Sequence, residues 1–276
     1  MAADAPLNHL VLAAASVSDD LGFVAMADLS NVLAELPEVE SRIIGGHMVS
    51  LHVQRWGLGR DLYRETQDTD LGIPPIAVKD GRLIDLLKRR GYDRTTGNTY
   101  ARRIEDVPVS VVDTPEMLAS IDLLVPAYTS RARDSLKVTD DLTTTEVLGL
   151  AEALQRPGVE VSLELHRLNG ETLTAELTLP DEVSAVVLKA LVWDRRGASK
   201  DAVDLWRMLE VAIAAGVSPD EFSEEAGTKS AEIARRSFEK LNEGAMKAIV
   251  SAQHLSGEAA QQRHTRIQAL LQRVIG

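Results

Sequence analysis

The sequence contains no cysteine and few aromatic residues. Without cysteine, the chain cannot form disulfide bridges, thiolate zinc sites or a cysteine nucleophile, and this composition fits a reducing compartment. Phe, Trp and Tyr make up only 4% of the residues, so the hydrophobic core must consist mainly of Leu, Val, Ile and Ala.

Long apolar runs and a basic leader are also missing. The apolar run at residues 10–15 is shorter than the core of a signal peptide. No other stretch approaches the roughly 20 apolar residues that a membrane-spanning helix needs. We therefore expect a cytoplasmic protein that does not interact with a membrane.

Acidic residues outnumber basic ones over the whole chain, 42 to 30, but basic residues are concentrated in the segment 86–103. The net charge of −12 counts against a surface devoted to nucleic acid. Screening confines electric fields to about 10 Å, however, so a local basic patch can still bind a polyanion. Such runs are usually solvated faces, but this one supplies the candidate nucleic-acid-binding residues: Lys88, Arg89, Arg90, Arg94, Arg102 and Arg103.

Periodicity and turn signals predict an α/β first part. Helical spacing covers a segment from Asp19 or Asp20, as the cap, to about Leu36, then His47 to Trp56, and about Lys79 to Arg90. Strand patterns cover residues 100–112 and 118–125, and alternation around Asn169-Gly170 predicts a hairpin of 159–165 and 172–179.

Only helical patterns follow residue 180. They cover about 181–195, 199–214, 218–226, 228–250 and 256–274. The sequence therefore predicts an α/β (α+β) fold, in which a mixed sheet flanked by helices occupies residues 1–180 and an all-helical part occupies 181–276.

Three acids have the spacing of a magnesium site. Asp68 and Asp70 are two residues apart, and side chains at i and i+2 of a strand point the same way. Asp122 interrupts an apolar strand, where an unpartnered carboxylate is costly. Carboxylate oxygens are the ligands that Mg²⁺ prefers. Two plainer interpretations remain open: the first two acids could be a solvated strand edge, and a core arginine could neutralise Asp122.

Gly45 and Gly46 precede a helix start. At such a position, free backbone N–H groups and the helix dipole favour the binding of phosphate. A pair of glycines, however, is most often only a turn. The nearby His47 and His52 are more typical of a helix surface than of ligands.

In order and spacing, these motifs resemble the AbiEii-type nucleotidyltransferases of the DNA polymerase β-like superfamily. That family includes the toxins of type IV toxin–antitoxin pairs and the mycobacterial MenT toxins. The resemblance covers about residues 20–210 and rests on Gly45-Gly46-His47, the run 64–70, the run 121–126, Lys189 to Arg196 and Lys200 to Leu205.

The resemblance implies a nucleotidyltransferase domain at 1–180, a helical C-terminal domain at 181–276 and a substrate cleft between them. It further implies Mg²⁺-dependent transfer of a nucleoside monophosphate from an NTP to a hydroxyl. The acceptor would be an RNA end such as that of tRNA, and the protein would be a toxin held in check by a cognate antitoxin.

The resemblance also assigns roles to residues. Asp68, Asp70 and Asp122 would hold one or two Mg²⁺ ions, Asp122 would help to deprotonate the attacking hydroxyl, and Lys189 and Asp201 would complete the catalytic set. The nucleotide would contact Gly45, Gly46, Arg64, Thr66 and Lys189. Many relatives have Ser at the position of Gly46, so here only the backbone could bind phosphate at that point.

Other interpretations stay open. Lys189 could be a lysine that snorkels from an apolar helix, and Lys200, Asp201 and Asp204 could form an exposed charged face. Arg64 could bind phosphate or pair with an acid. The same chemistry could act on a protein or on a small molecule such as an aminoglycoside, whose positive charge suits an acidic protein. The chain could also be a catalytically silent binding module.

Overall fold

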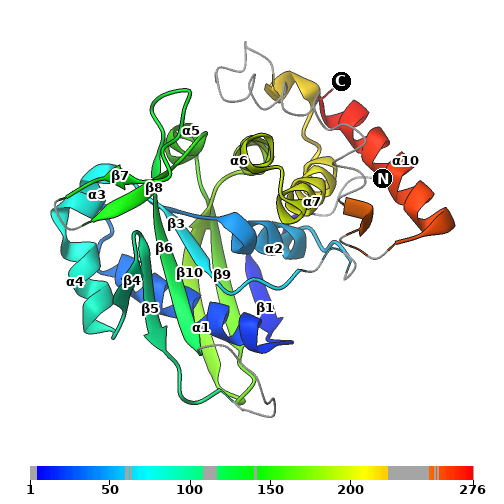
Figure 1. The fold of residues 1–276 in the computed structure, drawn as a ribbon. Coiled ribbons are helices and arrows are strands. Elements are labelled where there is room, and N and C mark those ends of the chain that lie inside the picture. The colour runs from blue at the N-terminus through cyan, green and yellow to red at the C-terminus, as the bar shows by residue number, and fades with distance from the viewer. Residues whose placement is uncertain are drawn as a thin grey trace.

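The computed structural model describes residues 5–59, 62, 64–107, 117–139, 142–222, 249–251, 253 and 255–275. Two β-sheets and the helices that flank them form an α/β protein, which confirms the predicted fold class (Figure 1). In Figure 1, the helices α2, α6 and α7 lie together at one end of the strands.

The larger sheet carries the acids of interest. Its main path has the order β2-β3-β6-β5-β4, formed by Arg42–Ile44, Thr69–Gly72, Leu118–Pro126, Thr99–Arg103 and Asp93–Thr96. β3 and β6 are parallel, whereas β2–β3, β5–β6 and β4–β5 are antiparallel. Beyond the end of β5, β6 pairs in parallel with β8 (Thr143–Val147), which also pairs with β7 (Leu136–Lys137).

The smaller sheet contains the predicted hairpin. β9 (Val159–His166) and β10 (Thr172–Leu179) are antiparallel, which confirms that prediction. Gly170 lies in the turn with φ +87°, a conformation that glycine adopts without strain. β1 (His9–Ala13), whose strand character we did not predict, pairs in parallel with β9.

Helix α1 (Val17–Ala34) contacts both sheets, through β10 and β6. Most of its side chains are therefore buried, as expected for a helix with apolar residues on several sides. The cap is Ser16, whose hydroxyl accepts a hydrogen bond from the Asp19 N–H, and not Asp19 or Asp20 as predicted. Asp20 instead forms a buried ion pair with Arg167.

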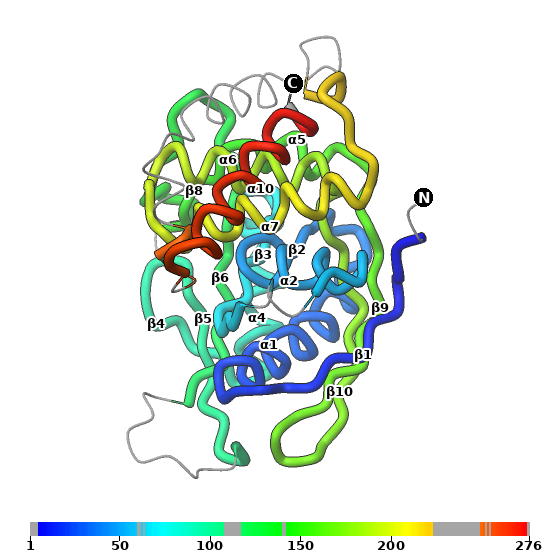
Figure 2. The backbone as a smooth tube through the Cα atoms, turned by 90° about the vertical axis from the view of Figure 1, so that its right-hand side faces the viewer, coloured from blue at the N-terminus to red at the C-terminus, as the bar shows by residue number. Residues whose placement is uncertain are grey.

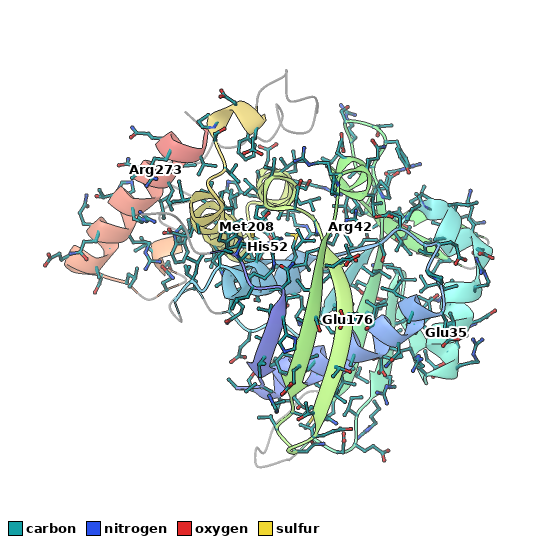
Figure 3. All side chains as sticks on the ribbon, turned by 180° about the vertical axis from the view of Figure 1, so that it is seen from behind. Glu35, Arg42, His52, Glu176, Met208 and Arg273 are labelled. Carbon is teal, nitrogen blue, oxygen red and sulfur yellow. The ribbon has the colours of Figure 1, made fainter. Side chains whose placement is uncertain are left out.

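Five other helices contribute to a second hydrophobic core. It joins α2 (Gly45–Arg55), α5 (Leu150–Gln155), α6 (Glu182–Arg196), α7 (Ser199–Ala215) and α10 (Gly257–Ile275). α10 packs across α7, as Figure 2 shows. Figure 3 labels His52 on α2 and Met208 on α7, two helices that pack against each other.

Several predicted boundaries were wrong. The helix predicted for Lys79 to Arg90 is two helices, α3 (Pro75–Asp80) and α4 (Arg82–Arg89), because Gly81 between them has φ +82°. The strand predicted from residue 100 ends at Arg103, and residues 108–112 lie outside the described part.

The C-terminal predictions have mixed outcomes. α6, α7 and α10 match their predicted ranges, whereas Pro219–Phe222 forms a 3₁₀ helix. Residues 223–248, which hold most of the helix predicted for 228–250, are outside the described part. The division into domains at residue 180 stays a prediction. Among the described helices, none combines the length and the apolar character needed to cross a bilayer.

Candidate active site

A pocket of about 420 Å³ lies between the larger sheet and the helices α6 and α7. The residues predicted for catalysis, metal binding and nucleotide binding all line it, although they come from distant parts of the sequence: Gly45, Gly46, Arg64, Thr66, Asp68, Asp70, Asp122, Lys189 and Asp201. Their chemical roles stay predictions, but their convergence on one pocket is a feature of the fold.

The strand pairing explains the carboxylate cluster on the sheet side. Asp70 of β3 is the register partner of Asp122 on the parallel strand β6, so the two side chains point to the same face. Asp68 precedes β3 and lies exposed at the pocket, so it does not share the strand with Asp70 as expected.

Two of the carboxylates have raised pKa values. Burial, followed by the charge of Asp122, raises the pKa of Asp70 to about 7. Desolvation by the surrounding protein and the charge of Asp122 also raise the pKa of Asp68. An oxygen of Asp122, Oδ1, is buried without a hydrogen-bond partner in the described structure, so no core arginine satisfies it.

Gly45 is glycine for two physical reasons. Its φ is +70°, which disfavours any other L-residue. A Cβ atom there would also lie 1.7 Å from Oδ2 of Asp70, because the preceding Ile44 is the register partner of Asp70 on β2. The glycine therefore makes room for the carboxylate.

Gly46 is restricted by different neighbours. A Cβ atom at this position would lie 2.5 Å from Oγ1 of Thr66 and 2.9 Å from Nη2 of Arg64. The hydroxyl of Thr66 thus fills space that a serine at position 46 would need.

On the helix side, positive charges surround one buried acid. Asp204 accepts hydrogen bonds from Lys189 at 2.8 Å, from Arg64 at 2.9 and 3.0 Å, and from Arg207 at 3.2 Å. Burial acts to raise the pKa of Asp204, but the charges of these three cations outweigh it, and its pKa is lowered. Asp204 therefore stays ionised, and the group carries an excess of positive charge.

These contacts decide between several open interpretations. Lys189 is 6% exposed and bound to Asp204, so it does not snorkel to water. Asp201 and Asp204 are buried, so they are not part of an exposed charged face. Arg64 pairs with Asp204, and its contact with phosphate stays a prediction. The oxygen Oδ2 of Asp201 is buried without a hydrogen-bond partner in the described structure, and burial raises the pKa of Asp201.

The two histidines of α2 are buried, contrary to the surface position we expected. His47 Nδ1 lies 3.1 Å from the carbonyl oxygen of Asp68, so it donates and fixes the segment that carries this acid. Burial lowers the pKa of His47 to about 4. His52 Nε2 lies 2.9 Å from the Pro180 carbonyl and links α2 to the start of α6.

Some lining residues were not among the predicted site residues. Arg196 and Lys200 follow Lys189 around the turn between α6 and α7, and Asp204 lies one helical turn after Lys200. Helical spacing from Lys189 could have identified Arg196. No sequence signal places Asn98 or Glu146 in the pocket, because they arrive on other strands and turns of the sheet.

The predicted nucleic-acid-binding residues do not line the pocket. They lie on α4, β4 and β5, except Arg90, which follows the end of α4. Arg102 pairs with Asp28, and both Arg89 and Arg90 pair with Glu35. Contact with nucleic acid stays a prediction for all six.

The carboxylate cluster fits a divalent cation by its chemistry. Among the described residues, no three acid, histidine or cysteine side chains already stand in ligating geometry. The unpartnered oxygen of Asp122 and the raised pKa values of Asp68 and Asp70 nevertheless mark a cluster of acids with too little positive charge nearby. A cation would supply that charge if the carboxylates turned toward it.

Comparisons with known proteins match no family model and no curated protein, and they find only distant structural similarity. An antigenic nucleotidyltransferase-like protein from Paracoccidioides brasiliensis is similar in structure, with 16% identity, a TM-score of 0.45 and coverage of 84% of this chain and 92% of that one.

A second similar structure is the antibiotic-resistance factor ANT(2'')-Ia. Its identity is 13% and its TM-score 0.38, and the match covers 80% of this chain and 93% of that one. Because both TM-scores and both sequence identities are low, the interpretation of function rests on the chemistry of the pocket.

Proposed function

We propose that the protein is a Mg²⁺-dependent nucleotidyltransferase that moves a nucleoside monophosphate from an NTP to an acceptor hydroxyl. One observation carries this proposal: a single pocket holds a cluster of acids on its sheet side and a group of cations around Asp204 on its helix side. A metal-bound triphosphate has the complementary arrangement, with a cation beside a polyanion.

The acids would hold the metal. Asp68, Asp70 and Asp122 offer the hard oxygen ligands that Mg²⁺ prefers. When bound, Mg²⁺ would neutralise the charge that develops on the phosphates during transfer.

The cations and the glycines would hold the triphosphate. Lys189 and Arg64 are within reach of Asp204 and line the pocket, so they can exchange this carboxylate for phosphate oxygens. The backbone at Gly45 and Gly46 begins α2, where the helix dipole favours an anion. Thr66 would add its hydroxyl from the space beside Gly46.

The reaction would be a displacement at the α-phosphorus. The acceptor oxygen forms a bond to phosphorus, the bond to the bridging oxygen breaks, and pyrophosphate leaves. Asp122 would take the proton of the acceptor hydroxyl, since its Oδ1 has no competing hydrogen bond in the described structure.

We further propose that the acceptor is an RNA end, with tRNA as the first candidate. Arg196 and Lys200 at the rim of the pocket suit an anionic acceptor better than a cationic drug. The biological role we propose is that of a growth-arresting toxin controlled by an antitoxin, and it rests on the sequence resemblance alone.

Labelled substrates test the reaction. The protein is incubated with Mg²⁺, each of the four α-³²P-labelled NTPs and, separately, total RNA, a protein lysate or an aminoglycoside. We expect label in tRNA together with pyrophosphate release, and neither with Asp68→Ala. Label in protein or drug would contradict the RNA acceptor, and no label with any NTP would contradict the enzymatic function.

Growth measurements test the proposed toxin role. Induced expression of the wild-type chain should arrest growth, whereas Asp68→Ala should not. Equal growth of both strains at equal protein levels would contradict a toxin.

A further inference from the structure

Arg195 lines the pocket but is bound by an acid outside it. Its guanidinium, at Nη2, contacts Oδ1 of Asp134 on the segment between β6 and β7. The side chain of Asp134 is 84% exposed, whereas that of Arg195 is 28% exposed. Asp134 does not line the pocket. The ion pair therefore ties a pocket residue to a solvated partner.

The segment that carries Asp134 is fixed by other contacts. Arg133 donates two hydrogen bonds from its guanidinium to Glu146, at 2.9 and 2.7 Å, and a third from its backbone N–H at 2.9 Å. The hydroxyl of Thr145 donates to the backbone carbonyl of Asp134 at 3.1 Å. The position of the segment therefore does not depend on Arg195, and the ion pair can break without loosening the loop.

Arg195 and Lys189 both line the pocket from α6, although they lie about 120° apart around the helix axis. Both are on α6, six residues apart, which corresponds to about 9 Å along the axis. Leu188 and Leu191 precede Arg195 at helical spacing, and all three line the pocket. A chain of phosphates held at Lys189 could therefore extend toward Arg195.

We propose that Arg195 is a phosphate-binding residue of this pocket and that Asp134 holds it aside until an anionic ligand replaces the carboxylate. The inference rests on the proposed function, because it assumes that a polyphosphate enters the pocket. An exposed ion pair contributes little, whereas a guanidinium binds phosphate through parallel charge-assisted hydrogen bonds. Asp134 remains in water after the exchange, so losing its partner costs little.

Two substitutions with opposite expected effects test this proposal. The probe is inorganic tripolyphosphate with Mg²⁺, titrated calorimetrically into the full chain, followed by the NTP that binds best. Arg195→Ala should weaken binding roughly 10-fold or more, the range of a lost charged hydrogen bond. Asp134→Ala should tighten it by about 2- to 5-fold, because Arg195 is released. Arg131→Ala, which removes an exposed charge from the same loop, is the matched control and should bind like wild type.

The outcomes are separable. Suppose that wild type binds the probe, but Arg195→Ala and Asp134→Ala weaken binding equally or leave it unchanged. The ion pair then only connects α6 to the segment between β6 and β7, and the proposal is wrong. If wild type binds neither tripolyphosphate nor any NTP, the proposed function itself fails. Thermal melting of each variant shows whether the fold is retained.

Discussion

Asp122 stands beside Asp70 as its register partner on the neighbouring parallel strand, and its charge helps to raise the pKa of Asp70. Such a pair persists in a buried pocket when it binds something positive. Substitution of either acid, or a change of pH, should therefore alter both the stability and the activity of the protein.

The Asp122→Asn variant should lose activity and gain stability. Removing the charge should lower nucleotidyl transfer by about 10³-fold or more, as expected for a lost metal ligand and base. In EDTA, the same change should raise the melting temperature by a few degrees, because Asp70 loses a repulsive neighbour.

Asp93→Asn is its charge-matched control, because Asp93 is exposed on β4. The control should retain activity and melt like wild type. A variant Asp122→Asn that keeps near-normal transfer would refute the assigned role.

The stability of the metal-free protein should depend on pH through Asp70. Its folded pKa of about 7 lies above the ordinary value of 3.8, so the folded state binds the proton more tightly than the unfolded state. This contribution favours folding at low pH and is lost as pH rises through 7. Thermal melts in EDTA should therefore show a decline between about pH 6.5 and 8 that Asp70→Asn abolishes and that Mg²⁺ reverses.

Two buried histidines have the opposite effect on the pH dependence of stability, but only below pH 6.5. Burial lowers the pKa values of His47 and His52 from 6.5 to about 4, so the folded protein loses stability through them as the pH falls below 6.5. Parallel pH profiles for wild type and Asp70→Asn in EDTA would contradict the assignment.

Gly45→Ala should displace the carboxylate of Asp70. The positive φ alone should cost about 1 kcal/mol, and the added Cβ would overlap Oδ2 of Asp70. Gly57→Ala is a matched control, since Gly57 has φ +59° and nothing within 4 Å of the added atom. Urea denaturation should show a larger loss for Gly45→Ala, and only this variant should lose transfer activity.

Asp204→Asn should be strongly destabilising, whereas Asp201→Asn should not. Asp204 neutralises Lys189, Arg64 and Arg207, and removing a buried partner of this kind costs about 3–5 kcal/mol. Asp201 is also buried on the same helix, but its pKa is raised, so the neutral amide should be tolerated. Denaturant titration of both variants measures the difference, and equal losses would contradict it.

The basic surface on α4, β4 and β5 should contribute to RNA binding only where it is unpaired. Lys88, Arg94 and Arg103 are exposed and form no ion pair with the described residues. Changing each to Gln should reduce the slope of log K against log salt by about 0.7 to 1 for each phosphate that the variant no longer neutralises. Arg82→Gln, which removes an arginine already paired with Asp80 and Glu38, is the control and should not change the slope.

The residues of the pocket could be predicted from the sequence better than the ion pairs that they form. Asp68, Asp70, Asp122 and Lys189 could be selected because acids and lysines are conspicuous within apolar patterns, and their order along the chain narrowed the choice. The ion pairs of Asp204 could not be read in the same way. Arg207 lies three residues after Asp204 on the same helix, but Lys189 comes from α6 and Arg64 from the segment before β3, and only the tertiary structure brings these two to Asp204.

Local signals failed where a tertiary contact or a single backbone angle decides the structure. His47 is buried because α1 passes close to it, so close that a Cβ on Gly22 would lie 2.6 Å from its Nε2. The break at Gly81 depends on one left-handed residue within an otherwise helical pattern. The cap at Ser16 was within reach of sequence reasoning, because a serine three residues before the Asp19 N–H is a normal cap.

The second hydrophobic core has a consequence for synthesis of the chain. Met48, Val49 and Val53 of α2 pack in the same core as α6 and α7, whose residues lie far downstream. At about 5–20 residues per second on the ribosome, this apolar face is made several seconds before the helices that cover it. A chain that terminates before α6 would therefore leave the apolar face of α2 exposed to water. Chaperones would matter most during synthesis, before α6 and α7 cover this face.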